Sequence, residues 1–530
     1  MMVSFQSIPE WPPLAWLAEC ERPGQRIHVS HGGGVETAES WFCEAVWPGE
    51  FSAGDIDRQD LLFGSGGRLR DGALTFVSSA ATVDRLQLLE TDARLLVSNS
   101  LACLLEAVGG EVEPVYSGYY RDFRSIVRGI RQYKPTLTTS AGEVRFVYHD
   151  NVVWDGAAWA RVEKPKRDRR FSHFESYRDF LAETLRGLGA NMASPRRIAY
   201  RFRPLGTVST GYDSPAVAAI AREAGLSEVI TFTHARGGDD DDGEAIARHL
   251  GLSVTRVPRG VWRSLDGAIV PHLASNAYGE EVPYAALARD LAGRVLFTGH
   301  TGDRAWGKDE DDLSADIPRG DPVGLSLTEA RLWYGALHCP VPFMGIREVA
   351  DLRAISVSPE MKAWDVPGEY SRPIPRRIAE EAGVPRELFG NTKRASAVVL
   401  WRRDETFLPA HEARKLRGWL EANDHRWSGK GLVSPLQRKR RERVLAGLMM
   451  LYRPVHSIAC RIPGLKPYSS RIRRLDPQTR PDPLFDVLFP WAIGLAKQRY
   501  RGGIARHKLA AQASYREPTS GIPLIRARRW

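Results

Sequence analysis

Residues 209–214, with the sequence STGYDS, combine hydroxyl groups, a glycine and a carboxylate in one short turn. The turn follows an apolar stub and precedes AVAAIAREAG, in which apolar residues recur at helical spacing. Successive backbone N–H groups and a helix N-terminus then point toward one place, which suits an anion such as pyrophosphate. Gly211 permits a close approach or a positive φ, and Ser209 and Ser214 add hydroxyl donors.

Asp213 is the unexpected member of this turn, because a carboxylate would repel a phosphate group. A divalent cation between the two removes the repulsion, so the turn predicts Mg²⁺ on a bound nucleotide. The structural alternative is a tight turn before a helix, with Asp213 or Ser214 acting only as the N-cap.

Two later segments carry further charged groups. The segment LFTGHTGDRAWG, residues 296–307, predicts a strand and then a glycine-rich turn, where Asp303 would supply a second Mg²⁺ ligand at a neighbouring strand end. The segment NTKRAS, residues 391–396, offers Lys393 as a fixed positive charge. His300 is either a neutral base for an incoming amine, because its ordinary pKa lies near neutrality, or a structural histidine.

The elements that must position these residues follow from the hydrophobic pattern. Residues 1–165 alternate short apolar runs with turn signals and predict a strand-rich domain. A helix is predicted over 174–193, and from there to residue 400 helices and short strands alternate, which indicates a mostly parallel sheet covered by helices. Residues 401–530 read as a basic helical extension, in which 483–500 is a docked helix interrupted by a proline.

In their order and spacing, the three segments resemble the synthetase domain of the asparagine synthetase family. There the pyrophosphate loop reads S-G-G-x-D-S, a later turn reads G-[DE]-G-x-D-E, and a lysine follows an arginine-rich helix. Residues 230–252 are similar to the strand, loop and acid-headed helix of that family, with Glu244 at the acidic position. The resemblance implies an α/β ATP pyrophosphatase (adenine nucleotide α-hydrolase-like) fold for residues 166–400.

The resemblance also implies the chemistry: ATP activates a small-molecule or peptide carboxylate as an acyl-adenylate, and an amine or ammonia attacks it. It assigns Asp213 and Asp303 to Mg²⁺ and Lys393 to the developing negative charge. The implied nucleotide-binding residues are Ser209, Thr210, Gly211, Asp213, Ser214, Thr231, Phe232, Thr233 and Gly299.

The later turn departs from the family pattern. His300 stands where the family has an acid, Thr301 replaces a glycine and Arg304 replaces the acid after Asp303. A degenerate, non-catalytic member that binds nucleotide or a partner is therefore the alternative to an ATP-dependent ligase.

The first 165 residues resemble, more weakly, the glutaminase domain of the same family, an Ntn-hydrolase-like fold. A glutaminase of this kind requires a cysteine directly after the initiator methionine, where the free α-amine serves as base. Here Met2 occupies that position and the nearest cysteine is Cys20. The sequence therefore predicts a scaffold without glutaminase activity, similar in this to β-lactam synthetases and lasso-peptide cyclases.

Composition narrows the remaining possibilities. The five cysteines are scattered and no segment approaches the roughly 20 apolar residues of a membrane span, so we expect a cytoplasmic protein. Residues 401–530 hold 28 Lys and Arg against 10 Asp and Glu, which concentrates the net charge of +10 in this part. The basic runs at 437–444 and 471–480 are predicted to be solvated helix faces, and the alternatives are contact with an acidic partner, anionic lipid or nucleic acid. The absence of a known nucleic-acid module argues against nucleic acid.

Overall fold

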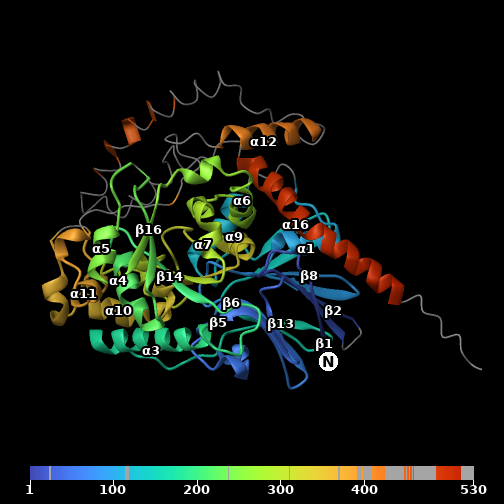
Figure 1. Cartoon of the computed structure of the whole chain (residues 1–530), viewed down its shortest axis with the longest axis horizontal. Coiled ribbons are helices and arrows are strands. Elements are labelled where there is room, and N and C mark those ends of the chain that lie inside the picture. Colours follow the sequence, from blue (N-terminus) through green and yellow to red (C-terminus); the bar gives the residue numbers. More distant parts are fainter. Residues whose placement is uncertain are drawn as a thin grey trace, which may run out of the picture.

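The computed structural model of the chain describes residues 1–22, 26–113, 118–236, 238–309, 311–367, 370–390, 397, 408–423, 444, 447–448, 450–452, 454–455, 458 and 485–514. These residues form three β-sheets with helices packed around them, and the mixed α/β character expected from the sequence is confirmed (Figure 1).

The first two sheets belong to the N-terminal part, drawn in blue and cyan in Figure 1. The larger sheet has the strand order β1 (Met2–Ser7), β3 (Arg26–His31), β2 (Trp16–Glu21), β9 (Arg94–Ser98), β8 (Leu86–Glu90), β11 (Gly142–Val147) and β10 (Thr136–Thr139). The smaller sheet has the order β13 (Trp159–Val162), β12 (Asn151–Trp154), β7 (Ala73–Val77), β6 (Phe63–Arg70), β5 (Trp41–Val46) and β4 (Glu36–Ala38). Apart from the parallel pair β1–β3, the paired strands in these two sheets are antiparallel.

Strand alternation explains why the two sheets form a sandwich. On β2, Trp16, Ala18 and Cys20 are buried in the core shared by both sheets, whereas Leu17 points to the opposite face. Trp16 stacks on Phe76 of the smaller sheet with ring centroids 6.1 Å apart. The strand-rich character expected for residues 1–165 is therefore observed.

The third sheet is entirely parallel and positions the polar turns described in the sequence. Its strand order is β16 (Ser253–Val257), β15 (Glu228–Phe232), β14 (Arg203–Thr207), β17 (Arg294–Thr298) and β18 (Ala336–Pro340). Successive residues of one strand face opposite cores: Val295 and Phe297 pack on one side and Leu296 on the other. Such two-sided burial is typical of a parallel sheet with helices on both faces.

The helices that contact this sheet include α4 (Asp213–Ile220), α5 (Glu244–His249), α7 (Ala288–Leu291) and α9 (Leu327–Tyr334), and α3 (Phe174–Met192) packs against α4 and against β5 of the smaller sheet. The predicted helix at 174–193 is confirmed by α3, which runs along the lower edge of the sheet in Figure 1. The helix expected after the strand at 230 is confirmed as well, because α5 begins at Glu244.

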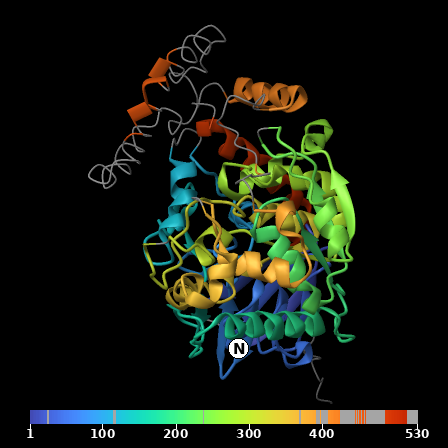
Figure 2. The ribbon, with the colours of Figure 1, turned by 90° about the vertical axis from the view of Figure 1, so that its left-hand side faces the viewer.

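The parallel-sheet unit and the sandwich pack directly on each other, as the side view in Figure 2 also shows. Arg331 of α9 reaches into the sandwich, where its guanidinium bonds Glu44 at 2.6 Å and Asp84 at 2.9 Å. The long helix α16 (Phe485–Ser514) lies across α1 (Leu101–Val108) and α6 (Val270–Asn276) and so contacts both parts.

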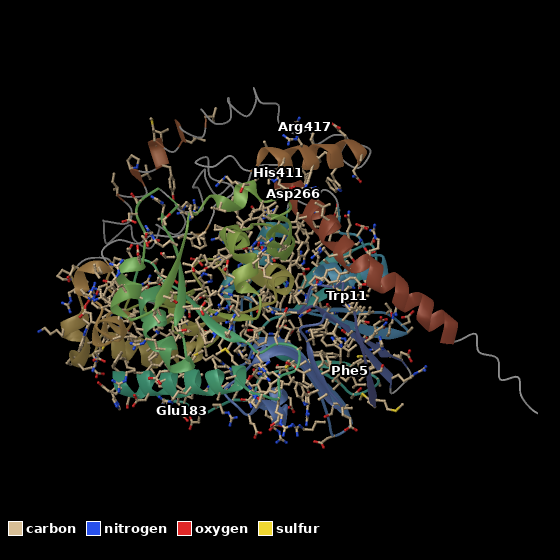
Figure 3. All side chains as sticks on the ribbon, viewed as in Figure 1. Phe5, Trp11, Glu183, Asp266, His411 and Arg417 are labelled. Atoms are coloured by element: carbon tan, nitrogen blue, oxygen red, sulfur yellow. The ribbon has the colours of Figure 1, made fainter. Side chains whose placement is uncertain are left out.

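Trp11 of the N-terminal part contacts α16 directly, because its indole N–H donates to the Tyr500 carbonyl at 3.1 Å. Figure 3 shows Trp11 beside this helix. The docked helix expected at 483–500 is thus observed, with Pro490 inside it. None of the described helices combines the length and apolar character that a membrane span requires. The basic runs at 437–444 and 471–480 lie outside the described residues, except for Val444.

Candidate functional site

A pocket opens at the carboxyl ends of β14, β15 and β17. It holds about 1140 Å³ of space, including solvent at its mouth. β14 is the first strand of the parallel sheet in sequence, with β15 on one side and β17 on the other, so the chain reverses its winding direction there. Open α/β sheets bind ligands in the crevice at this switch point. The lining includes Ser209, Gly211, Asp213, Ser214, Phe232, Glu280, Glu281, Gly299, His300, Asp303, Asp321, Tyr370 and Arg372.

The turn after β14 leads directly into α4. Ser209 Oγ lies 2.9 Å from Ser214 Oγ. The N-cap of α4 is Tyr212, whose side chain makes no capping hydrogen bond, so Asp213 and Ser214 follow the cap position and do not occupy it. The φ of Gly211 lies outside the left-handed region, and a Cβ there would meet protein atoms only at 3.6 Å or more. The conformation therefore does not require glycine, but the absent side chain leaves room for a ligand against the backbone.

Tyr212 anchors this turn from below. Its side chain is completely buried. Its hydroxyl donates to the Tyr370 carbonyl at 3.1 Å and accepts from Arg376 Nη2 at 2.7 Å. Arg376 also lies over the Tyr212 ring, 4.9 Å from its centroid. Tyr212 therefore ties the turn to α11 (Pro373–Glu381).

Asp213 forms an ion pair that the sequence did not indicate. Its Oδ2 accepts from Arg372 Nη1 at 2.6 Å. Burial opposes the charge of Arg372, but the negative charges of Asp213 and Asp303, together with Tyr370, outweigh it and raise the arginine pKa. Arg372 therefore stands in the field of both carboxylates to which Mg²⁺ was assigned.

Two glycines of the turn after β17 let it touch Asp213. A Cβ at Gly299 would lie 2.7 Å from the Asp213 Cβ, and one at Gly302 would lie 2.5 Å from the Asp213 Cγ. Neither distance is sterically possible, so both positions require glycine. Thr301, between them, adopts φ +70°, a left-handed conformation that glycine adopts without strain.

His300 lines the pocket with its ring at right angles to that of His338, centroids 5.1 Å apart. His338 in turn exchanges a hydrogen bond with the Thr298 hydroxyl at 2.8 Å. Burial and the charge of Arg319 lower the pKa of His300 to about 4, against a smaller opposing effect of Asp303. The imidazole is therefore neutral at physiological pH, and a group with so low a pKa is a poor general base.

The structure brings six of the expected nucleotide-binding residues to the pocket wall: Ser209, Gly211, Asp213, Ser214, Phe232 and Gly299. Three lie elsewhere. The Thr210 hydroxyl turns to Asp241 at 2.8 Å, the buried Thr231 hydroxyl accepts from the Gly243 N–H at 2.9 Å, and the Thr233 hydroxyl lies 2.9 Å from His234 Nδ1. Lys393 lies outside the described residues.

Sequence reasoning missed several residues of the pocket. Arg372 comes from the segment before α11, Glu280 and Glu281 from the loop after α6, and Asp321 from a long loop before α9. The available signals were weak: an arginine before a proline-initiated helix and two adjacent glutamates in an otherwise apolar stretch, SNAYGEEVPY.

Cys20, the cysteine nearest to the N-terminus, is deeply buried. Cys20 lies inside β2, and burial together with the charge of Glu19 raises the pKa of its thiol to about 12. A thiol that remains protonated at neutral pH is a poor nucleophile. Met2 begins β1 and its side chain is exposed.

Another polar cluster lies at α12 (Ala410–Ala422). Figure 3 shows Asp266 next to His411, which lies in the first turn of this helix, and Glu412 completes the group. The Lys415 ammonium contacts Asp266, and Glu412 accepts from the Gly267 N–H at 2.6 Å. These contacts make the cluster an ion-pair network that holds α12 against the segment before α6.

Comparison with known proteins gives no family. No family model and no curated protein matches the chain. Among solved structures, the chain is similar to the crystal structure of a predicted subunit of tRNA methyltransferase from Methanocaldococcus jannaschii, with 16% identity over 37% of this chain and 97% of that chain and a TM-score of 0.17. So low a TM-score does not establish a shared fold.

Proposed function

We propose that this protein is an ATP-dependent amide-bond-forming ligase. It activates a small-molecule or peptide carboxylate as an acyl-adenylate, releases pyrophosphate, and transfers the acyl group to an amine or ammonia. The observation that carries the proposal is the meeting of two carboxylate-bearing turns, residues 209–214 and 299–303, in one pocket at the switch point of a parallel sheet. We accordingly assign residues 166–400 to an ATP pyrophosphatase-type domain and residues 1–165 to an Ntn-hydrolase-like scaffold.

The donor set fits magnesium and a polyphosphate. Mg²⁺ takes oxygen ligands and is usually held by one or two carboxylates together with substrate phosphates, and Asp213 and Asp303 both line the pocket. Ser209, Ser214 and the open backbone at Gly211 supply donors for phosphate oxygens on the same side. When bound, ATP would supply the adenylyl group and the pyrophosphate leaving group.

Arg372 has a specific task in this scheme. Its Nη1 lies 2.6 Å from Asp213 Oδ2, and its pKa is raised above the ordinary value for arginine. The guanidinium is therefore charged at neutral pH. A fixed guanidinium beside the phosphate site stabilises negative charge that develops on the leaving group. Lys393, for which the sequence predicts the same task, stays a prediction.

We infer that the amine comes from outside residues 1–165. The Cys20 thiol is buried and its pKa is raised, so this part of the chain is proposed to act only as a scaffold. The buried contacts between Arg331 and the sandwich are consistent with this structural role.

A second candidate is a nucleotide-binding protein without catalysis. The Arg372–Asp213 ion pair favours it, because an arginine already neutralises the carboxylate that Mg²⁺ would need. The neutral His300 in place of an acid points in the same direction.

Pyrophosphate release separates the two candidates. Amino acids and peptides are screened as carboxylates, with MgATP and ammonium chloride present, and each active carboxylate is retested with Asp303→Asn, Arg372→Met and Lys393→Ala. A preorganised charge is worth about 10²–10³ in rate, so each variant should lower turnover by that factor.

The matched control is Glu183→Gln, an isosteric change at an exposed position on α3, which should leave turnover unchanged. If no carboxylate stimulates release from the unmodified chain while MgATP still binds, the ligase proposal fails and the non-catalytic candidate takes its place.

A further inference from the structure

We propose that the pocket contains a subsite for a protonated amino group, formed by Glu280, Glu281 and Asp321, which we call the acidic wall. Glu280 and Glu281 precede the helical turn that starts at Val282, and all three residues line the pocket. This inference deepens the proposed function. It rests on that function only in treating the bound amine as a substrate.

Glu280 carries the key observation. The residue is only 6% exposed, and its Oε2 accepts from Asn276 Nδ2 at 2.9 Å. Its Oε1 is buried and has no hydrogen-bond partner within the described part of the chain. A buried carboxylate oxygen without a donor costs folding free energy, so a ligand that donates to Oε1 recovers it.

Unlike Glu280, Glu281 accepts hydrogen bonds from protein groups on both of its carboxylate oxygens. Its carboxylate accepts from the Gly324 N–H at 2.7 Å and the Ser326 N–H at 3.1 Å, and also from the Ser326 hydroxyl. These donors hold Glu281 in place. Glu280 is thus the member of the pair with an oxygen left for a ligand.

The charges around the wall favour a cation. The pocket lining contains six carboxylates. Arg372 also lines the pocket, but its guanidinium donates a hydrogen bond to Asp213. Arg319 is buried nearby and feels the charges of Asp321 and Glu281. Burial, then Glu281 and Asp321, raise the pKa of Glu280 well above its ordinary value, and a bound cation would offset the two charge contributions.

The neighbouring side chains favour an alkylammonium group over a bare metal ion. Pro283, Tyr284 and Val323 line the pocket beside the acidic wall and provide apolar surface for the carbon chain of an amine. Tyr284 packs edge-on against Phe232, which comes from the end of β15, so this apolar surface continues toward the expected nucleotide side.

Calorimetric titration of the full chain tests the inference. The probes are n-butylammonium chloride and uncharged n-butanol, each with and without MgATP. We expect millimolar or tighter binding of butylammonium, at least tenfold tighter than butanol, and at least tenfold loss of this affinity in Glu280→Gln. Asp321→Asn, a milder change of the same wall, should weaken binding about threefold or more, and Glu183→Gln should match the unmodified chain.

Each outcome decides the inference. The inference is overturned if butylammonium binds no more tightly than butanol. It is also overturned if Glu280→Gln and Asp321→Asn both bind butylammonium as tightly as the unmodified chain does. If Mg²⁺ binds at the wall and butylammonium does not, the wall is a metal site and the inference fails. MgATP affinity in the same samples reports separately on the proposed function: amine binding without MgATP binding removes the ligase proposal and leaves the subsite.

Discussion

Two buried glutamates, Glu44 in the sandwich and Glu280 in the pocket, show how differently the two parts of this molecule treat charge. Glu44 is 1% exposed, and its carboxylate accepts from Ser65 at 2.5 Å, Asn99 at 3.1 Å and Arg331 at 2.6 Å. Glu280 is also buried, at 6% exposed; its Oε2 accepts from Asn276, but its Oε1 has no hydrogen-bond partner among the described residues. The Glu44 carboxylate is fully hydrogen-bonded within the protein, whereas Glu280 has an oxygen that is available to a ligand.

The largest expected effect comes from Arg331→Met, because it leaves Glu44 and Asp84 buried without their cation. Breaking a buried ion pair by removing one partner costs about 3–5 kcal/mol, so the urea unfolding midpoint should fall strongly. Glu183→Gln, at an exposed position, should change the unfolding free energy by less than about 0.5 kcal/mol. A loss below about 1 kcal/mol in Arg331→Met would show that the sandwich does not depend on this charge.

Glu280→Gln should raise the free energy of unfolding slightly, whereas Arg331→Met lowers it. This gain should grow as the pH rises. Because burial raises the pKa of Glu280, the native chain holds this proton at pH values where an unfolded glutamate, with a pKa of about 4.3, has lost it. The unmodified chain therefore loses stability as the pH rises above about 4.3, and the variant does not.

Urea midpoints at pH 5 and pH 8 measure this. The free energy of unfolding of Glu280→Gln, measured relative to the unmodified chain, should be higher at pH 8 than at pH 5. A difference that is unfavourable at both pH values would mean that Glu280 is satisfied by the fold, as Glu44 is.

A smaller effect is expected at Thr301, where the pocket turn stores backbone strain. A non-glycine residue in the left-handed region costs about 1 kcal/mol or more, so Thr301→Gly should raise the unfolding free energy by up to about 1 kcal/mol. Thr301→Ala keeps the Cβ and should show no gain. Equal behaviour of the two variants would place the effect in the lost side chain and not in the backbone.

Local features of the sequence predicted much of this arrangement. The turn at 209–214 and the helix after it depend on neighbouring residues, as do α3 and the start of α5 at Glu244. The order of the polar turns along alternating strands also placed Asp213 and Asp303 at one sheet edge, where both now line the pocket.

The remainder of the site depends on tertiary contacts without a local signal. Arg372 lies 159 residues after Asp213, with which it pairs. Glu280 and Asp321 reach the pocket from loops whose course is set by packing, and Thr210 turned away because Asp241 offers both its amide and its hydroxyl an acceptor.

We propose that Asp213 serves a magnesium-bound nucleotide and does not merely hold Arg372. Calorimetry of ATP binding, in MgCl₂ and in EDTA, tests it with the unmodified chain, Asp213→Asn and Glu183→Gln. We expect ATP to bind the unmodified chain and Glu183→Gln only with Mg²⁺, and Asp213→Asn to lose at least tenfold in affinity. ATP binding that is independent of Mg²⁺ and equally tight in Asp213→Asn would contradict the claim.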